Sequence, residues 1–188
     1  MKKYLRLCMT TCLAAALFSC GSDDDNNEVA DEVWKQKNEQ AFADKAFDAT
    51  FTRYTSLSNS GVLYYKQITP GNGKRIFYNS RVDVYYEGSL IDGTVFDKRD
   101  STEHIPFKVA ISSAVADNSS TTSTGYISGV IKGWTEILQL MTEGEEGVVW
   151  IPQEMAYGTE WDSGKVIPPY STLLFKLKIE KVTWYDEI

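Results

Sequence analysis

The segment from Thr172 to Val182 constrains the fold of this chain more than any other. Apolar Leu173, Phe175, Leu177 and Ile179 alternate there with charged residues. A period of two places successive side chains on opposite faces of an extended chain, so it predicts a strand with one buried face. Such a strand belongs in an antiparallel sheet that packs one face against a core.

Other segments have the composition of strands, and one has the period of a helix. We expect further strands at Val62 to Ile68, Arg81 to Leu90, Thr94 to Phe96, Pro106 to Ile111 and Gly147 to Ile151. From Gly133 to Thr142 the apolar residues share one face, which predicts an amphipathic helix that ends before Gly144. Antiparallel strands with one helix indicate an α+β domain.

Asp92-Gly93 lies between two of these strands and predicts the turn that joins them. Asp-Gly is favoured in two-residue type I′ hairpin turns, because both central positions of that turn need positive φ. The strands before and after this turn are therefore expected to pair with each other.

Residues 1–19 have the organisation of an export signal. Lys2, Lys3 and Arg6 precede an apolar stretch, Leu7 to Phe18, that is too short to span a bilayer. The run Leu17-Phe18-Ser19-Cys20 resembles a bacterial lipobox, in which cleavage precedes a cysteine that receives lipid, although Phe18 departs from the usual small residue. The alternative is ordinary cleavage that leaves Cys20 as a free thiol.

Removal of the signal has two consequences. Cys20 remains as the one cysteine, because Cys8 and Cys12 lie before it, so no internal disulfide is expected. Three basic residues and no acidic residue are lost, which changes the formal charge from -7 to -10. An acidic chain without a basic stripe is a poor partner for nucleic acid.

Residues 20–27 predict a lipidated acidic tether. Gly-Ser-Asp-Asp-Asp-Asn-Asn follows the cysteine, and such a polar, like-charged run would hold the domain away from the lipid. It resembles the tag of surface-exposed lipoproteins of Bacteroidetes-type bacteria. We therefore expect a lipid-anchored protein of the cell envelope, in the outer membrane, with its domain either periplasmic or surface-exposed.

Residues 28–58 are expected to form a helical N-terminal extension, since no Pro or Gly interrupts them. Phe47, Phe51 and Tyr54 have the i, i+4, i+7 spacing of one helix face. This face would dock on the main domain or pair with a second copy in a homodimer. Turn-forming residues from Ser56 to Gly61 mark the start of the main domain near residue 59.

The common catalytic residue sets are missing from the sequence. His104 is the single histidine and has no ligand set near it, so neither a metal nor another cofactor is expected. There is no Gly-x-Ser-x-Gly elbow and no Cys/His pair in the sequence. Residues 112–128, rich in Ser and Thr, are expected to form a loop inserted between a strand and the helix.

Four motifs in order carry a resemblance to a known family. They are Val84-Tyr-Tyr-Glu-Gly88 with Leu90-Ile-Asp-Gly-Thr-Val-Phe-Asp97, Val130-Ile-Lys-Gly-Trp134, Ala156-Tyr157-Gly158, and Ile167-Pro-Pro169 with Thr172-Leu-Leu-Phe175. From about Ser60 to Lys181 the chain resembles the FKBP-type peptidyl-prolyl cis-trans isomerases. The resemblance implies a half-wrapped antiparallel sheet around one short helix, with an apolar pocket between them.

The resemblance also assigns roles to residues. Asp97, Tyr157 and Phe96 would be catalytic. The substrate-binding residues would be Tyr86, Phe107, Val130, Ile131, Trp134, Ile167 and Phe175. Trp134 would form the floor of the pocket and Ile167 its apolar lip. The Tyr157 hydroxyl and the Ile131 backbone N–H would orient the peptide by hydrogen bonds.

The expected function is isomerisation of Xaa-Pro bonds in exported proteins. Amide resonance opposes rotation with a barrier of ~18–20 kcal/mol, and the twisted transition state has lost that resonance, so an apolar pocket favours it. Two alternatives stay open. Tyr157 and Asp97 would instead be a buried pair that braces loops, or the domain would be a non-catalytic peptide-binding or chaperone module whose pocket the insertion covers.

Overall fold

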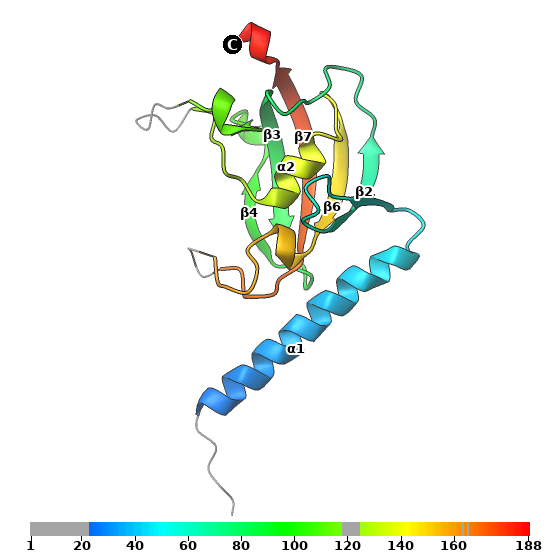
Figure 1. Cartoon of the computed structure of the whole chain (residues 1–188), viewed down its shortest axis with the longest axis vertical. Coiled ribbons are helices and arrows are strands. Elements are labelled where there is room, and N and C mark those ends of the chain that lie inside the picture. The colour runs from blue at the N-terminus through cyan, green and yellow to red at the C-terminus, as the bar shows by residue number, and fades with distance from the viewer. Residues whose placement is uncertain (1–22, 118–124, 163, 165) are drawn as a thin grey trace, which may run out of the picture.

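The computed structural model describes residues 23–117, 125–162, 164 and 166–188, with the backbone alone for 23–30. The predicted signal, Cys20 and the middle of the predicted insertion lie outside these residues. Figure 1 shows a single sheet with the short helix α2 packed on it and the long helix α1 at one end.

Seven antiparallel strands form the sheet in the order β1-β2-β6-β7-β3-β4, and β5 also pairs with β3. Their bounds are β1 Thr52–Thr55, β2 Val62–Thr69, β3 Arg81–Ser89, β4 Val95–Arg99, β5 Phe107–Ala110, β6 Glu146–Ile151 and β7 Leu173–Thr183. The helices are α1 Asp23–Ala43 and α2 Lys132–Leu138, and short 3₁₀ turns are η1 Asp44–Phe47, η2 Ser101–Glu103, η3 Ser113–Val115, η4 Gln153–Met155 and η5 Tyr185–Glu187. This architecture confirms the predicted α+β fold class.

The core lies between α2 and the inner face of the sheet. Leu173, Phe175, Leu177 and Ile179 of β7 are each at most 5% exposed, as their alternation predicted. β3 pairs with β7 along its length, while β4 and β5 share its other edge. β4 pairs with one half of β3 and β5 with the other half. Side chains from all three strands therefore lie next to the space beside α2.

The hairpin predicted at Asp92-Gly93 is present, but its turn differs. The Leu90 amide donates to the Thr94 carbonyl at 2.9 Å and the Gly93 amide to the Leu90 carbonyl at 3.0 Å, which closes a three-residue loop. Of the two predicted residues, Gly93 alone has positive φ, +88°. The prediction of a type I′ turn is therefore wrong, because a type I turn followed by one left-handed residue accommodates Asp-Gly equally well.

α2 ends at Leu138, before the predicted end at Thr142. A turn follows in which the Met141 amide donates to the Leu138 carbonyl at 3.1 Å, and Met141 is buried. This buried side chain continues the helical spacing of apolar residues beyond the helix itself. Gly144, expected directly after the helix, lies instead in the turn before β6 with φ of +85°.

α1 begins earlier than predicted, since residues 23–27 of the expected tether are helical. No Pro or Gly separates them from the helix formers that follow, so nothing in the sequence stops the helix there. The helix therefore begins inside the segment predicted as a tether, and the tether itself stays a prediction.

The expected helix face at Phe47, Phe51 and Tyr54 is wrong. Phe47 ends the 3₁₀ turn η1 and is 88% exposed, whereas Tyr54 lies in β1. β1 pairs with β2, opposite Val62 to Tyr65. Backbone pairing with this neighbouring strand outweighs the helical spacing, which is a weak local signal when a sheet edge is available.

α1 docks on the main domain through one face, which was one of the two expected arrangements. Trp34, Asn38 and Phe42 lie four residues apart on that face, and the Phe42 ring meets the Tyr64 ring at 5.0 Å. Asn38 is fully buried, whereas Val33 is 45% exposed on another side of the helix. A homodimer through the extension stays a prediction, and it would have to use a face other than the docked one.

The described ends of the insertion pack against the beginning of β3. Val115 is buried, and its carbonyl accepts Arg81 Nε at 2.7 Å. Arg81 also pairs with Asp117 at 2.6 Å, and the Tyr126 hydroxyl donates to Asp83 at 2.6 Å. Both ends of the insertion are thereby attached to the same strand.

Candidate functional site

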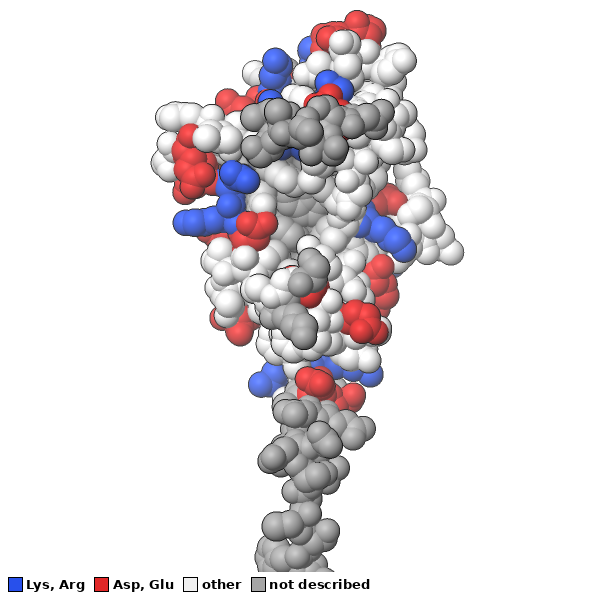
Figure 2. Space-filling view, turned by 90° about the vertical axis from the view of Figure 1, so that its left-hand side faces the viewer, with Lys and Arg blue, Asp and Glu red and all other residues white. Residues whose placement is uncertain are grey.

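Nine of the ten residues predicted for the site line one pocket of about 120 Å³. They are Tyr86, Phe96, Asp97, Phe107, Val130, Ile131, Trp134, Tyr157 and Phe175, and Asp97 is the one charged residue among them. An apolar cavity of roughly 150 Å³ holds a benzene ring, so this pocket suits one small ring. Figure 2, which views the β4 side of the molecule, shows an uncharged hollow between charged side chains on both flanks.

Trp134 is the centre of an aromatic cluster at the bottom of the pocket. Its ring meets Tyr86 at 5.0 Å, Phe175 at 5.2 Å and Phe107 at 6.0 Å, always nearly perpendicular. Edge-to-face pairs of this kind contribute about 0.5–1.5 kcal/mol each beyond their burial. Trp134 is 4% exposed, so the rings form a rigid floor.

Phe96 and Phe175 meet across Gly88 of β3. Their ring centroids are 5.6 Å apart, and a Cβ at Gly88 would lie 2.7 Å from atoms of both rings. Only glycine leaves this space free, because a methyl group would push the two pocket walls apart. The sequence showed Gly88 only as part of a motif, and its packing role follows from the structure.

Tyr86 and Asp97 form the polar edge of the pocket. The Tyr86 hydroxyl donates to Asp97 Oδ2 at 2.5 Å. Burial, followed by this bond to Asp97, raises the pKa of Tyr86 far above its ordinary value, so the hydroxyl remains a donor. The hydrogen-bond partner of Asp97 is therefore Tyr86. Tyr157 and Asp97 do not form the hydrogen-bonded pair that the alternative interpretation expected.

The two predicted donors, the Tyr157 hydroxyl and the Ile131 amide, both belong to residues that line the pocket. Among the residues that the structure describes, neither donor has an acceptor. Burial and the nearby carboxylates of Asp162 and Asp97 raise the pKa of Tyr157, which keeps its hydroxyl protonated. Both groups are available to a carbonyl oxygen in the pocket.

Ile167 is the one predicted site residue that does not line the pocket. It is 3% exposed and packs in the main core, so it does not form the expected lip. Its backbone is held in the loop by Asp162. Asp162 Oδ1 accepts the amides of Val166 and Ile167, each at 2.6 Å, and Oδ2 accepts the Gly164 amide at 2.8 Å.

Asp162 was missed at the sequence level. Its signal is an aspartate two residues before a glycine in a loop, which is typical of side chains that bind their own backbone. This pattern is too common in sequences to identify a functional loop. The structure is needed to show which backbone amides bind the aspartate.

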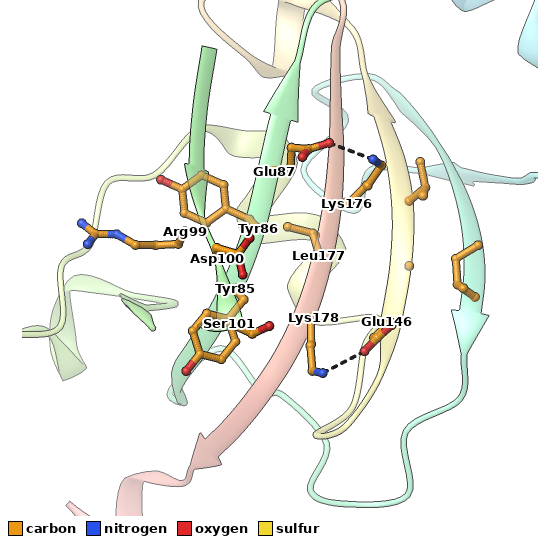
Figure 3. Close-up of a pocket in the computed structure, with 13 residues that line it drawn as sticks. Tyr85, Tyr86, Glu87, Arg99, Asp100, Ser101, Glu146, Lys176, Leu177 and Lys178 are labelled. Carbon is orange, nitrogen blue, oxygen red and sulfur yellow. Dashed lines mark hydrogen bonds and ion pairs between the residues drawn. The ribbon is translucent and has the colours of Figure 1, made fainter. Parts of the chain in front are cut away.

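A larger hollow of about 360 Å³ lies on the outer face of the sheet (Figure 3). Two ion pairs cross it between neighbouring strands, Lys176–Glu87 at 2.7 Å and Lys178–Glu146 at 3.0 Å. These carboxylates are partly exposed and paired, as is common on the solvent face of a sheet. Of the predicted site residues, Tyr86 alone borders this hollow, so we assign the candidate site to the aromatic pocket.

Comparison with known proteins shows the family. A family model described as FKBP-type peptidyl-prolyl cis-trans isomerase matches residues 73–180, which include every residue that lines the aromatic pocket. The chain belongs to this family. Membership confirms the predicted FKBP-type family and the predicted enzyme class, peptidyl-prolyl cis-trans isomerase.

Several relatives of this FKBP-type chain are known. The FKBP-type 22 kDa peptidyl-prolyl cis-trans isomerase of Escherichia coli (strain K12) is 34% identical over 161 residues, which are 83% of this chain and 68% of that protein. The outer membrane protein MIP of Legionella longbeachae is 39% identical over 120 residues, 64% of this chain and 44% of that protein. The crystal structure of FkpA from Escherichia coli matches with a TM-score of 0.65 and 27% identity, over 86% of this chain and 64% of that one.

Proposed function

We propose that this FKBP-type chain isomerises Xaa-Pro bonds of exported proteins in its aromatic pocket. The observation that carries the proposal is the pocket itself, in which one carboxylate and eight uncharged residues surround a space for a single ring. Uncatalysed Xaa-Pro isomerisation takes ~10–100 s and is slow enough to limit folding, so exported chains that contain proline would fold faster with such a catalyst.

The pocket would act by replacing water around the prolyl amide. The planar amide is more polar than the twisted form, because resonance separates charge between nitrogen and oxygen. Rings such as Trp134 and Phe175 solvate that charge less well than water does, so binding destabilises the planar form relative to the twisted one. Only this difference between the two states accelerates the rotation.

The polar groups at the edge would hold the peptide while the bond rotates. The Tyr157 hydroxyl and the Ile131 N–H would donate to peptide carbonyls, which keeps the chain on one side of the proline fixed. Asp97, oriented by Tyr86, would act electrostatically on the displaced carbonyl.

NMR exchange spectroscopy of an Xaa-Pro peptide tests the proposal. We expect exchange well above the uncatalysed rate, and loss of most of this enhancement in Asp97→Ala. Asp100→Ala is the matched control, because Asp100 accepts the Thr102 amide at 2.9 Å outside the pocket. A folded chain that binds the peptide without accelerating exchange would support the non-catalytic peptide-binding alternative instead.

We also propose that Cys20 carries a lipid that anchors the domain to the outer membrane. The predicted export signal, the run that resembles a lipobox and the acidic residues after Cys20 support this location. Among the described residues, no helix is both long and apolar enough to cross a bilayer. The relative from Legionella longbeachae is named an outer membrane protein. Labelled palmitate should enter the wild-type chain in its bacterial host and be absent from Cys20→Ser, whereas an unlabelled wild-type chain would contradict the anchor.

A further inference from the structure

We propose that α1 positions the substrate pocket, with Asn38 as the residue that links the helix to it. The inference rests on the proposed function and concerns how Tyr157 is held in place. Asn38 lies outside the matched family region, yet it is 0% exposed. A side chain with a polar donor and a polar acceptor is rarely buried so completely unless both groups are bonded.

Asn38 joins α1 to the segment that enters β7. Its Oδ1 accepts the Thr172 amide at 2.8 Å, and its backbone carbonyl accepts the Thr172 hydroxyl at 3.4 Å. Its Nδ2 donates to the Trp34 carbonyl at 2.9 Å. Trp34 Nε1 in turn donates to Ser171 Oγ at 3.1 Å. Two successive residues before β7 are therefore bonded to one face of α1.

Tyr170, directly before these two residues, has a strained backbone. Its φ is +62°, in the left-handed region that disfavours residues with a Cβ. Such a conformation persists only where the surroundings determine it. Here α1 fixes Ser171 and Thr172 on one side, and the Lys35 ammonium of α1 lies 5.2 Å from the centre of the Tyr170 ring.

Tyr170 holds the residue next to Tyr157. Its amide donates to the Gly158 carbonyl at 2.9 Å, and this bond closes the base of the loop 158–170. Tyr157 precedes Gly158 and lines the pocket. Figure 1 shows this loop, coloured orange, at the end of the domain that faces α1. Bonds and adjacent residues thus connect Asn38 through Thr172 and Tyr170 to Tyr157.

Loss of the bond between Asn38 and Thr172 would leave a buried amide without an acceptor and release Tyr170 from its conformation. The backbone next to Tyr157 would then be held less firmly, and the Tyr157 hydroxyl would spend less time in position to bind the peptide. Because that hydroxyl binds the peptide in its planar and twisted forms alike, the loss raises KM more than it lowers kcat. Asn38 acts through Tyr157 and is a positioning residue.

A double-mutant cycle on the full chain tests this link. Asn38→Ala should lower kcat/KM for a proline peptide by about tenfold, mostly through KM. In a Tyr157→Phe background, which lacks the hydroxyl, the same substitution should change kcat/KM by less than about twofold. Glu39→Ala, on the exposed side of α1, is the matched control and should keep wild-type values. An equal loss in both backgrounds, or no loss at all, overturns the proposal.

Hydrogen exchange gives a readout that does not depend on activity. The Tyr170 amide should exchange about tenfold faster in Asn38→Ala than in wild type, because its bond to Gly158 opens more often, while amides of β3 stay unchanged. Glu39→Ala should leave Tyr170 unaffected. Unchanged exchange at Tyr170 overturns the proposal even if the wild-type chain has no isomerase activity. Faster exchange in an inactive chain would support the link and reject the proposed function.

Discussion

The hydroxyl of Tyr86 donates a 2.5 Å hydrogen bond to Asp97, so the one charged residue of the pocket is held by one of its aromatic walls. β3 and β4 pair with Gly88 opposite Asp97, which places Tyr86 diagonally across from the carboxylate. The position of the ring and the position of the charge are therefore coupled.

Tyr86→Phe should separate these two roles, since it keeps the ring and removes the hydroxyl. Asp97 is exposed, so the lost bond should lower the free energy of unfolding by about 1 kcal/mol or less. If the poorer orientation of Asp97 raises the activation free energy by a similar amount, kcat/KM falls about fivefold. Tyr85→Phe is the control, because successive side chains of β3 alternate between its faces and Tyr85 does not line the aromatic pocket. If Tyr86→Phe isomerises the peptide with wild-type kinetics, the hydrogen bond from Tyr86 is not needed to orient Asp97.

Gly88→Ala should damage the pocket from inside. The new Cβ would lie 2.7 Å from Phe96 and Phe175, and overpacking of this kind costs about 1–3 kcal/mol. We expect a lower free energy of unfolding in urea and loss of most isomerase activity. Gly93→Ala is a control of similar stability cost, because Gly93 has φ of +88° but open space around it. Similar activities in the two variants would contradict the packing role of Gly88.

Asp162 should make the loop before Ile167 sensitive to acid. Burial alone would raise the pKa of Asp162, but the amides of Ile167, Gly164 and Val166 lower it below its usual value. The stabilisation that these hydrogen bonds give the loop is therefore complete above the pKa of Asp162 in the unfolded chain, which is about 3.9. It is lost as pH falls through the pKa of Asp162 in the folded chain.

Amide exchange at Val166 and Ile167, corrected for intrinsic chemistry, measures this effect. It should accelerate below about pH 4 in wild type and already be fast at pH 7 in Asp162→Ala. Asp48→Ala is the matched control, since Asp48 accepts the Thr50 amide at 3.1 Å in a separate loop. If exchange at Val166 and Ile167 in the wild-type chain is no faster in acid than at pH 7, Asp162 does not hold the loop.

Replacement of residues 118–124 by two glycines tests whether the insertion acts on the pocket. The described ends bond to Arg81 and Asp83, and Arg81 is about 16 Å along β3 from Tyr86 at ~3.3 Å per residue. We expect kcat/KM to stay within about twofold, and stability to change little because loop-closure entropy depends weakly on length. A several-fold rise in kcat/KM would show that the insertion restricts access to the pocket.

Much of the fold and most of the site were predictable from local patterns. Alternation in β7 identified the inward side chains, and the same period put Tyr86 and Phe175 on one face of the sheet. Trp134 reached the pocket because helical spacing placed it on the buried face of α2. The motif order then indicated the family, and nine of the ten predicted residues line one pocket.

Local sequence patterns were enough to predict six of the seven strands, the helix of the core and the residue types of the pocket, because periodicity and turn chemistry act over a few neighbouring residues. Long-range contacts were needed to show that Tyr54 joins a strand, that Ile167 turns into the core and that Asn38 holds Thr172. Each of these outcomes depends on a contact with a residue far away in the sequence. A hydrogen bond or a sheet edge formed with such a residue outweighs the local conformational preference.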